Sequence, residues 1–502
     1  MTRTNHPPVE QKELSLMSPQ TISSLSGSAP TSNRHRDAGQ QNGETNGVKL
    51  KVEACRSLLQ PTPKDQVHDL ICVGFGPASL AIAIALHDAL ELQERSSLWA
   101  LNGRQPNVAF LEKQRDFAWH PGMLLEGARM QINFIKDMAT LRNPRSSFTF
   151  LNYLHNKGRL VQFTNLGTFL PQRIEFEDYL KWCAGWFDDV VQYGQEVLSI
   201  TPDFLPFEQK DITRFQVTYR DVRTGLLSSL RTRHVVIAAG GSGTIPLPFP
   251  QNDPRIIHSS QYASITPRFL KNRDQGYRIA VVGSGQSAAE IFDDLHSRYP
   301  NSRTSLIIRS AALRPSDDSP FVNEIFNPSR VSEFYSQPAC IRESSNIKNR
   351  CTNYGVVRLE LLERLYEKSY MQRIRYGNDE RDWPHRIIPN STVVAVNAFD
   401  KFVSIYTDVS GKDGPHMMEF DFVIVATGYT RNEHEKLLGK WLRDIPGKDR
   451  SHRSWTVGRD YRVNFESEPA ISPEAGVWLQ GYNENTHGVR NAQTFSLQQQ
   501  TC

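Results

Sequence analysis

Residues 71–86 read ICVGFGPASLAIAIAL, and residues 279–292 repeat the same pattern as IAVVGSGQSAAEIF. Each stretch joins a short apolar run to a Gly-x-Gly turn and then to a run of small, helix-forming residues. This order is typical of a buried parallel strand that passes through a tight turn into a helix. The backbone amides of such a turn, together with the helix N-terminus, can hold a pyrophosphate. The two stretches therefore predict two dinucleotide-binding units in one chain.

Apolar strands and helical segments alternate along the rest of the chain. This alternation predicts an α/β fold with parallel sheets, and the two glycine turns predict two Rossmann-like dinucleotide-binding domains within it. The segments that carry the prediction are strands at residues 108–113, 234–241, 304–310 and 420–429, and helices at residues 77–92, 173–191 and 354–374.

The residue that ends the strand after each glycine turn indicates which dinucleotide binds there. Glu112 stands at the tip of the strand at 108–113, and a carboxylate at this position accepts both hydroxyls of an adenosine ribose. Arg309 stands at the end of the strand at 304–310, where a guanidinium suits a 2′-phosphate that an acidic residue would repel. We therefore predict a tightly held flavin at the first turn and NADPH at the second. Surface roles for Glu112 and Arg309 are the alternatives.

The composition limits the class of protein. The 502 residues are 38% hydrophobic and 22% charged, with a formal net charge of +4. These values are ordinary for a soluble globular protein and predict no nucleic-acid or membrane partner. No apolar run approaches the roughly 20 residues of a membrane span. The sequence shows no secretory signal, so a cytoplasmic location is expected.

Six cysteines are scattered without a C-x-x-C pair or a zinc-like spacing, and no metal site is expected. No cysteine lies between Cys72 and Cys183, which argues against a disulfide reductase, because that class needs a redox pair beside the flavin. Oxygen activation by the flavin is then the favoured chemistry. Asp317 and Asp318 are adjacent acids without a histidine or third acid nearby in the sequence, and a loop or helix-capping role is expected for them.

The apolar strand at residues 420–429 ends in Ala-Thr-Gly-Tyr and resembles the strand at 234–241 more than any strand of the second unit. This likeness predicts that the chain leaves a first domain, builds an inserted domain and then returns. Residues 1–66 hold little that can be buried and are expected to be disordered. The predicted divisions are a disordered segment at 1–66, an FAD-binding domain at 67–270 and 411–488, an NADPH-binding domain with substrate-binding segments at 271–410, and an atypical C-terminus at 489–502.

Five long stretches carry a more specific resemblance, at residues 117–160, 283–292, 313–328, 353–361 and 423–435. Here the chain resembles the N-hydroxylating flavin monooxygenases, and most of all the fungal L-ornithine N(5)-monooxygenases of hydroxamate siderophore synthesis. The resemblance extends over about residues 66–488. It implies an FAD- and NADPH-dependent enzyme of iron homeostasis that hydroxylates the side-chain amine of L-ornithine with O2, and a homo-oligomer, which in the family is a homotetramer.

The resemblance also implies roles for individual residues, none of them a catalytic acid or base. Lys136 resembles the lysine that binds the amino-acid carboxylate, and Asn323 and Asn353 resemble the amides that hold the substrate's backbone groups. Together with the first turn, it gives as FAD-binding residues Gly74, Gly76, Pro77, Ser79, Glu112, Lys113, Gln114, Arg115, Asp116, Phe117, Ala118, Trp119, His120, Gln131 and Val197. The NADPH-binding residues are Gly283, Ser284, Gly285, Gln286, Ser287, Arg309 and Asn353, and the substrate-binding residues are Lys136, Asn323, Glu324, Ile325, Phe326 and Asn353.

The end of the chain departs from the family. After YNENTHG at residues 482–488 the family continues into an apolar helix, whereas this chain reads VRNAQTFSLQQQTC and stops at Cys502. Three alternative functions stay open: hydroxylation of lysine or another diamine, oxidation of a sulfur or a ketone, and an inactive flavin-binding remnant. Lys136 with Asn323 argues against the second, because these residues suit a zwitterionic amino acid.

Overall fold

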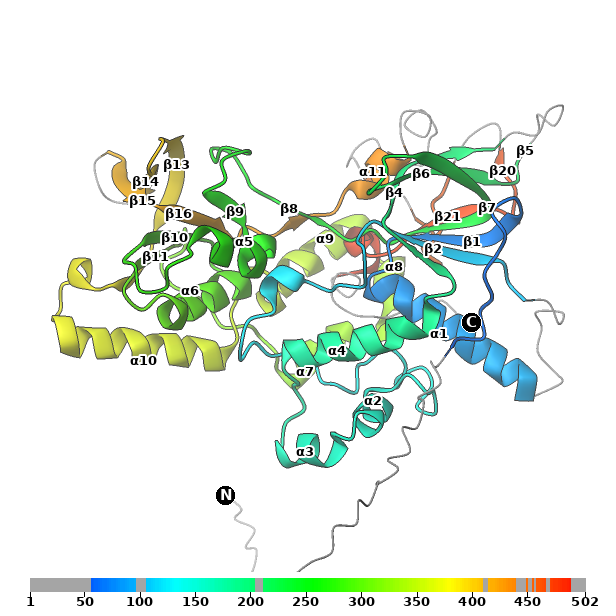
Figure 1. Ribbon diagram of the computed structural model, residues 1–502, viewed down its shortest axis with the longest axis horizontal. Helices are drawn as coiled ribbons and strands as arrows, with labels where there is room; N and C mark the ends of the chain where they lie inside the picture. The colour runs from blue at the N-terminus through cyan, green and yellow to red at the C-terminus, as the bar shows by residue number, and fades with distance from the viewer. Residues whose placement is uncertain are drawn as a thin grey trace, which may run out of the picture. The chain divides into compact units, whose positions relative to one another are not determined.

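A computed structural model of the protein describes residues 56–95, 105–203, 211–409, 414–438, 448–449, 454–455, 457–465 and 470–488 (Figure 1). The first glycine turn follows the strand β1 of a seven-stranded sheet in which the order is β3-β2-β1-β7-β6-β4, with β21 paired to β7. Its strands are β1 (Val67–Val73), β2 (Val108–Glu112), β3 (Val191–Tyr193), β4 (Gln195–Pro202), β6 (Phe215–Asp221), β7 (Leu227–Ile237) and β21 (Gly476–Leu479).

The strands around the first glycine turn are parallel, as the sequence predicts. β1 pairs in parallel with β2 on one side and with β7 on the other. β7 is long enough to hold two further partners on its free side, antiparallel β6 along its first part and parallel β21 along its second. β4 extends the sheet as an antiparallel partner of β6. The predicted α/β class is therefore confirmed, with antiparallel strands added at one edge.

Both faces of this sheet are covered. Cys72 and Phe110 point to one face and pack with helices α1 (Pro77–Arg95) and α4 (Arg173–Ala184). Ile71 points to the other face and packs with apolar side chains of the antiparallel strands. Burial on both faces explains why these strands read as continuous apolar runs. The same burial places the glycine turn between the sheet and the start of α1.

The second glycine turn follows β10 of a five-stranded, wholly parallel sheet of order β12-β11-β10-β16-β9. Ile279 and Val281 of β10 pack with helices α6 (Gln286–Arg298) and α10 (Leu359–Tyr376). Figure 1 shows these helices together on one side of the sheet. The strands are β9 (Ile256–His258), β10 (Arg278–Val282), β11 (Arg303–Ile307), β12 (His385–Ile388) and β16 (Phe422–Val425).

The opposite face of this second sheet is covered by an antiparallel meander. Ala280 and Val282 of β10 point toward it and share a core with Ile405. The sequence did not predict this sheet. Its strands are β13 (Ser391–Ala398), β14 (Val403–Val409) and β15 (His416–Phe420).

The placement of β16 corrects a prediction. The sequence assigned this strand to the first domain, but β16 pairs with β10 and β9 in the second sheet. Its likeness to β7 has a physical cause, since each lies beside a strand that carries a glycine turn. A Cβ on Gly74 would stand 2.8 Å from the carbonyl oxygen of Ala238, which follows β7, and a Cβ on Gly283 would stand 2.4 Å from that of Ala426, which follows β16. Both glycines also have positive φ.

The chain returns to the first sheet at β21 rather than at β16. β9 already belongs to the second sheet, although it lies within the span 67–270. The two sheets therefore do not follow divisions at residues 270 and 410, and the domain bounds themselves stay a prediction.

The start of the described chain is ordered, contrary to the predicted disorder of residues 1–66. The Ser57 N–H donates to the Trp186 carbonyl at 2.8 Å, and Leu59 is buried in the core beside α1. Pro61 forms a bridge to Val108. This short apolar stretch is held by packing, which the polar composition around it obscured. The rest of the predicted disordered segment, and the atypical C-terminus at 489–502, lie outside the described residues.

Shorter elements complete the fold. The predicted helix at 354–374 begins only at α10, because Val357 pairs its backbone with the segment at Arg314 instead. Within the described residues, no helix is both long and apolar enough to cross a membrane. The remaining helices are α2 (Phe150–Asn156), α3 (Leu160–Asn165), α5 (Tyr262–Phe269), α7 (Pro320–Asn323), α8 (Val331–Ser336), α9 (Ala339–Lys348), α11 (Glu433–Leu437) and α12 (Glu484–His487).

The other short strands form two-stranded pairs. They are β5 (Asp211–Ile212), which pairs with β20 (Ala470–Ile471), β8 (Ser242–Gly243), which pairs with β17 (Tyr429–Thr430), and β18 (Lys448–Asp449), which pairs with β19 (Ser454–Trp455).

Candidate active site

The first glycine turn has the shape of a pyrophosphate cradle. Gly74 takes the sharp turn out of β1 at φ +88°, and Pro77 begins α1. A Cβ on Gly76 would have no atom within 4 Å, so the space over this residue is open to a ligand. Ser79 is fully buried where α1 packs on the sheet. The residues at this turn therefore fit a dinucleotide phosphate.

Glu112 ends β2 beside this turn, at the place predicted for a ribose contact. Its Oε2 accepts the Phe75 N–H at 2.7 Å and its Oε1 accepts the Gln114 N–H at 2.8 Å. Only 8% of the residue is exposed. Each carboxylate oxygen keeps a further lone pair, so Glu112 can hold the turn and accept ribose hydroxyls together.

The predicted FAD-contacting stretch follows the carboxyl end of β2. Lys113, Gln114, Arg115 and Asp116 are exposed, Phe117 is buried, Ala118 and Trp119 are partly buried, and His120 is exposed with a positive φ. The Lys113 ammonium lies 4.0 Å from the Glu196 carboxylate of β4, next to the partly buried Val197. Gln131 is exposed on a separate loop. The contact between Lys113 and Glu196 joins the residue after β2 to the residue before Val197 on β4.

The second glycine turn is built like the first. Gly285 caps α6 in an extended conformation with no side-chain cap, so the first amides of the helix remain available as donors. Gly285 and Ser284 lie against Gly355, which places this turn next to Asn353. Ser287 is partly buried on the first turn of α6. The predicted NADPH residues of the turn therefore lie against Gly355, two residues along the chain from Asn353.

Gln286 of this turn is held by its own side chain. Its Oε1 accepts the Arg358 N–H at 2.9 Å, and its Nε2 donates to Glu290 Oε1 at 2.9 Å. Glu290 in turn receives two hydrogen bonds of 2.9 Å from the Arg173 guanidinium of α4. Both ends of the Gln286 amide are thus occupied, which gives it a structural role that the sequence did not predict.

Arg309 lies just beyond β11, at the edge of the second sheet where the glycine turn also lies. The residue is exposed, and its guanidinium has no hydrogen bond or ion pair to any part of the chain that the structure describes. A free guanidinium beside a dinucleotide turn fits the 2′-phosphate of NADPH.

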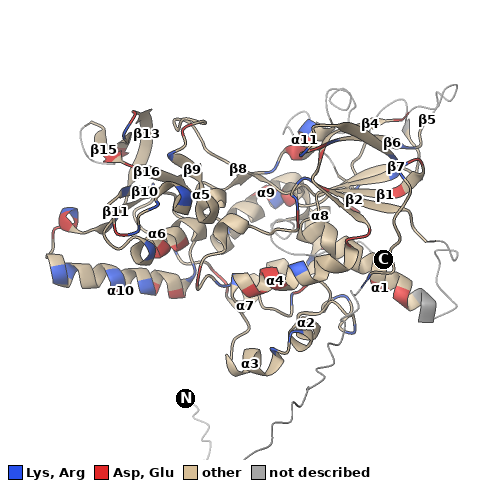
Figure 2. Ribbon diagram, viewed as in Figure 1, with Lys and Arg blue, Asp and Glu red and all other residues tan. Residues whose placement is uncertain are grey.

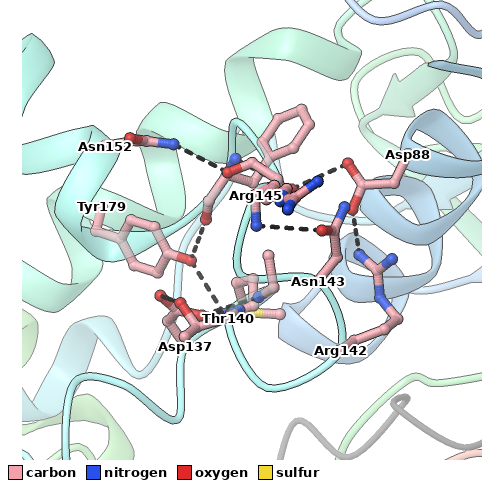
Figure 3. Close-up of polar contacts among 12 residues, drawn as sticks. Asp88, Asp137, Thr140, Arg142, Asn143, Arg145, Asn152 and Tyr179 are labelled. Carbon is pink, nitrogen blue, oxygen red and sulfur yellow. Dashed lines mark hydrogen bonds and ion pairs between the residues drawn. The ribbon is translucent and has the colours of Figure 1, made fainter. Parts of the chain in front are cut away.

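Lys136 is partly buried and lies on a loop between Phe134 and Asp137, which are both hydrogen-bonded to other segments. Its ammonium has no hydrogen bond or ion pair among the described residues. Asp137 is 3% exposed and accepts hydrogen bonds from Ala139, Thr140 and Phe150. Figure 3 shows Asp137 beside Thr140. Burial raises the pKa of the Asp137 carboxyl, and these hydrogen bonds oppose the rise. The loop therefore carries an unpaired ammonium next to a hydrogen-bonded, buried carboxylate.

Asn323 ends the short helix α7, and its side-chain carbonyl oxygen is available to accept a hydrogen bond from a ligand. Its Nδ2 donates to the Asp318 carbonyl at 2.8 Å, and its Oδ1 has no partner among the described residues. Glu324, Ile325 and Phe326 form the 3-10 turn that follows. The Oδ1 of Asn353 accepts the Thr352 hydroxyl at 3.2 Å. No hydrogen bond or ion pair joins these segments to Lys136 in the described chain.

Asp317 has the loop role that the sequence predicted. Its carboxylate accepts the Ser319 N–H at 3.1 Å, just before α7. Asp318 lies 3.7 Å from the Arg358 guanidinium.

The sequence did not predict a contact between Tyr354, which follows Asn353, and Glu484 of α12. The Tyr354 hydroxyl donates to Glu484 Oε2 at 2.5 Å, and Asn346 Nδ2 donates to the Glu484 carbonyl at 3.0 Å. Burial, together with the bond to Glu484, raises the pKa of the Tyr354 hydroxyl. These residues lie far apart in the sequence, and no local pattern signals the pair.

Two glycine turns, each after a strand with parallel neighbours in its own sheet, define an oxidoreductase fold that holds two dinucleotides. Residues 66–431 match the family described as L-lysine 6-monooxygenase/L-ornithine 5-monooxygenase. The chain is also 54% identical over 452 residues to an L-ornithine N(5)-monooxygenase of Cochliobolus heterostrophus, covering 86% of this chain and 85% of that protein. The chain therefore belongs to the L-lysine 6-monooxygenase/L-ornithine 5-monooxygenase family.

Solved structures of similar proteins agree with this assignment. The ornithine hydroxylase PvdA of Pseudomonas aeruginosa is 36% identical, with a TM-score of 0.74 over 85% of this chain and 95% of that one. The ornithine N-hydroxylase of Kutzneria sp. 744, described with reduced FAD, NADP⁺ and L-ornithine, is 31% identical, with a TM-score of 0.75 over 87% of this chain and 97% of that one.

Proposed function

We propose that this chain hydroxylates the side-chain amine of L-ornithine with O2, using FAD and NADPH. The product is N(5)-hydroxyornithine, the starting unit of a hydroxamate siderophore, and the reaction thereby serves iron homeostasis. Family membership and the likeness to ornithine hydroxylases support the proposal. The observation within the chain that carries it is the unpaired ammonium of Lys136, a partly buried residue.

The polar groups of the loop and of α7 complement a zwitterionic amino acid. The Lys136 ammonium pairs with the substrate carboxylate, a charge-assisted contact that is stronger than a neutral hydrogen bond. The free Oδ1 of Asn323 accepts from the substrate's α-ammonium, and Asn353 adds a second amide. Glu324, Ile325 and Phe326, in the turn that follows Asn323, add further substrate contacts. Captured at its α-carbon end, ornithine leaves its side-chain amine as the group that reacts.

Each of the two glycine turns binds a different cofactor. The first turn and Glu112 hold the adenosine half of FAD, and the second turn and Arg309 hold NADPH with preference over NADH. FAD, once reduced by NADPH, supplies the oxygen chemistry. The chain itself orients both dinucleotides and the amine and excludes water from the site. No described residue needs to act as a general base in this scheme.

We further propose that the protein is a cytoplasmic homo-oligomer, a homotetramer as in the family. The four cysteines that the structure describes are unpaired, which fits a reducing compartment; they are Cys72, Cys183, Cys340 and Cys351. Tyr366, Tyr370 and Ile374 form an exposed apolar face of α10 at four-residue spacing. Figure 2 shows that acidic and basic residues interleave along the same helix, so no single sign of charge opposes a second copy.

Purified protein provides the test of this function. We expect bound FAD, NADPH oxidation, and a hydroxylamine product that forms with L-ornithine in preference to L-lysine or 1,4-diaminobutane. Preference for lysine would move the assignment to the other activity of the family. Bound FAD without any amine-dependent hydroxylamine would instead identify an inactive flavin-binding protein, the alternative that the atypical C-terminus raised.

A further inference from the structure

The backbone around Lys136 is fixed on its N-terminal side by an aromatic contact. The Phe134 N–H donates to the Phe169 carbonyl at 2.9 Å. The Phe134 ring stacks on the ring of Phe169 with centroids 5.9 Å apart, and it also contacts Phe150 at 5.5 Å. The Ile135 N–H donates to Asn133 Oδ1 at 3.0 Å, which turns the chain toward Lys136. One side of the lysine is therefore held by packing.

On its C-terminal side the lysine is followed directly by a buried carboxylate, Asp137. Its Oδ1 accepts the N–H groups of Ala139 at 2.9 Å and Thr140 at 2.6 Å. Its Oδ2 accepts the Thr140 hydroxyl at 2.7 Å and the Phe150 N–H at 2.7 Å. All these partners are donors, so the ionised carboxylate suits the site and an amide would not. The Phe150 contact joins the loop to the start of α2.

A second buried carboxylate, Asp88 of α1, fixes the far end of the same loop. It pairs with the Arg142 guanidinium and accepts the Ser146 hydroxyl at 2.9 Å. Asp88 makes no hydrogen bond or ion pair with Lys136 or Asp137 in the described chain. The two carboxylates therefore have separable roles, since each holds a different end of the loop.

We propose that Asp137 is a positioning residue for Lys136: its carboxylate fixes the peptide that carries the substrate-binding lysine. The inference rests on the proposed role of Lys136 in ornithine capture. A long lysine side chain samples many rotamers, and a fixed backbone limits the volume in which its ammonium lies. Asp137 itself does not touch the substrate. Its effect is therefore confined to substrates that Lys136 binds.

The test compares Asp137→Asn with the parent enzyme, both loaded with FAD. An asparagine turns its amide donor toward the Phe150 N–H and loses that bond. We expect the KM for ornithine to rise about tenfold, the size of one lost hydrogen bond to a charged group, with an unchanged rate of flavin reduction by NADPH. Hydroxylation of 1,4-diaminobutane, which lacks the carboxylate, should not change. Thr140→Val, which removes only a hydroxyl donor, should give a smaller rise in the same KM.

Two controls make the result specific. Asp88→Asn also weakens a buried contact of the loop and should lower thermal stability while it leaves the ornithine KM unchanged. In a Lys136→Ala background, Asp137→Asn should add nothing to the KM. An unchanged ornithine KM in both Asp137→Asn and Thr140→Val, an equal loss with 1,4-diaminobutane, or a further rise in the Lys136→Ala background would overturn the inference. An unchanged KM in Lys136→Ala alone would instead overturn the role of Lys136.

Discussion

The ion pair between Arg173 and Glu290 gives the sharpest test of how the two halves of the site are joined. Arg173 lies on α4 beside the first sheet, and Glu290 lies on α6 beside the second glycine turn. Two hydrogen bonds of 2.9 Å connect them, and a third joins Arg173 to the Met123 carbonyl at 2.8 Å. The side chains are only 12% and 7% exposed, so water barely screens the pair.

Replacement of Arg173 by alanine would leave the Glu290 carboxylate buried without its cation. Removal of one partner from a buried ion pair costs about 3–5 kcal/mol. We therefore expect Arg173→Ala to lower the free energy of unfolding by about that amount in urea titrations. Because Glu290 also holds Gln286, the same variant should slow flavin reduction by NADPH.

A more exposed pair, joined by one hydrogen bond, serves as the control. The Arg220 guanidinium lies 2.5 Å from the Glu196 carboxylate, with side chains 47% and 29% exposed. Arg220→Ala should cost less than about 1 kcal/mol, as exposed pairs do. If Arg173→Ala lost no more stability than Arg220→Ala, the reasoning from burial would be refuted. If it lost stability but reduced flavin at the parent rate, the link through Gln286 would be refuted.

Three further predictions concern single residues. Arg309→Ala should weaken the use of NADPH by about 1–3 kcal/mol and leave NADH nearly unchanged in steady-state assays; equal losses with both would exclude the 2′-phosphate contact. Lys136→Ala should abolish hydroxyornithine formation at ordinary ornithine concentrations while NADPH still reduces the flavin; survival of turnover at the parent KM would contradict its role. Burial lowers the pKa of His487 to about 4, so the unfolded state binds a proton more readily than the folded state. The free energy of unfolding should therefore fall by about 3 kcal/mol as the pH drops from above 6.5 to 4. His487→Gln should remove this part of the pH dependence in urea titrations.

Local patterns predicted the parts of the fold that local chemistry determines. β1, β2, β10 and β11 are buried on both faces and read as apolar runs, and Gly74 and Gly283 mark the turns that follow. The antiparallel strands and the meander were not predicted, because strands such as β6 alternate buried and part-exposed residues and leave no continuous apolar run in the sequence. β16 was assigned to the wrong sheet because its sequence resembles that of β7. Each of these strands lies beside the strand that leads into a glycine turn, so the same sequence pattern occurs in both sheets.

In the candidate site, too, local patterns predicted some features and could not predict others. The sequence located Glu112, Arg309 and the two turns, because a strand end fixes where such a residue lies. It could not show that Glu112 holds the Phe75 N–H, or that Arg173 reaches Glu290 across 117 residues of chain. Contacts of this kind follow from the packing of whole elements, and no spacing in the sequence signals them.

The origin of the product's oxygen atom tests the central claim most directly. The protein would be supplied with NADPH, L-ornithine and ¹⁸O2, and the product would be analysed by mass spectrometry with fragmentation. The account predicts one ¹⁸O atom per hydroxyornithine, bound to the side-chain nitrogen. Unlabelled product, label on the α-nitrogen, or NADPH oxidation that yields hydrogen peroxide without hydroxyornithine would contradict it.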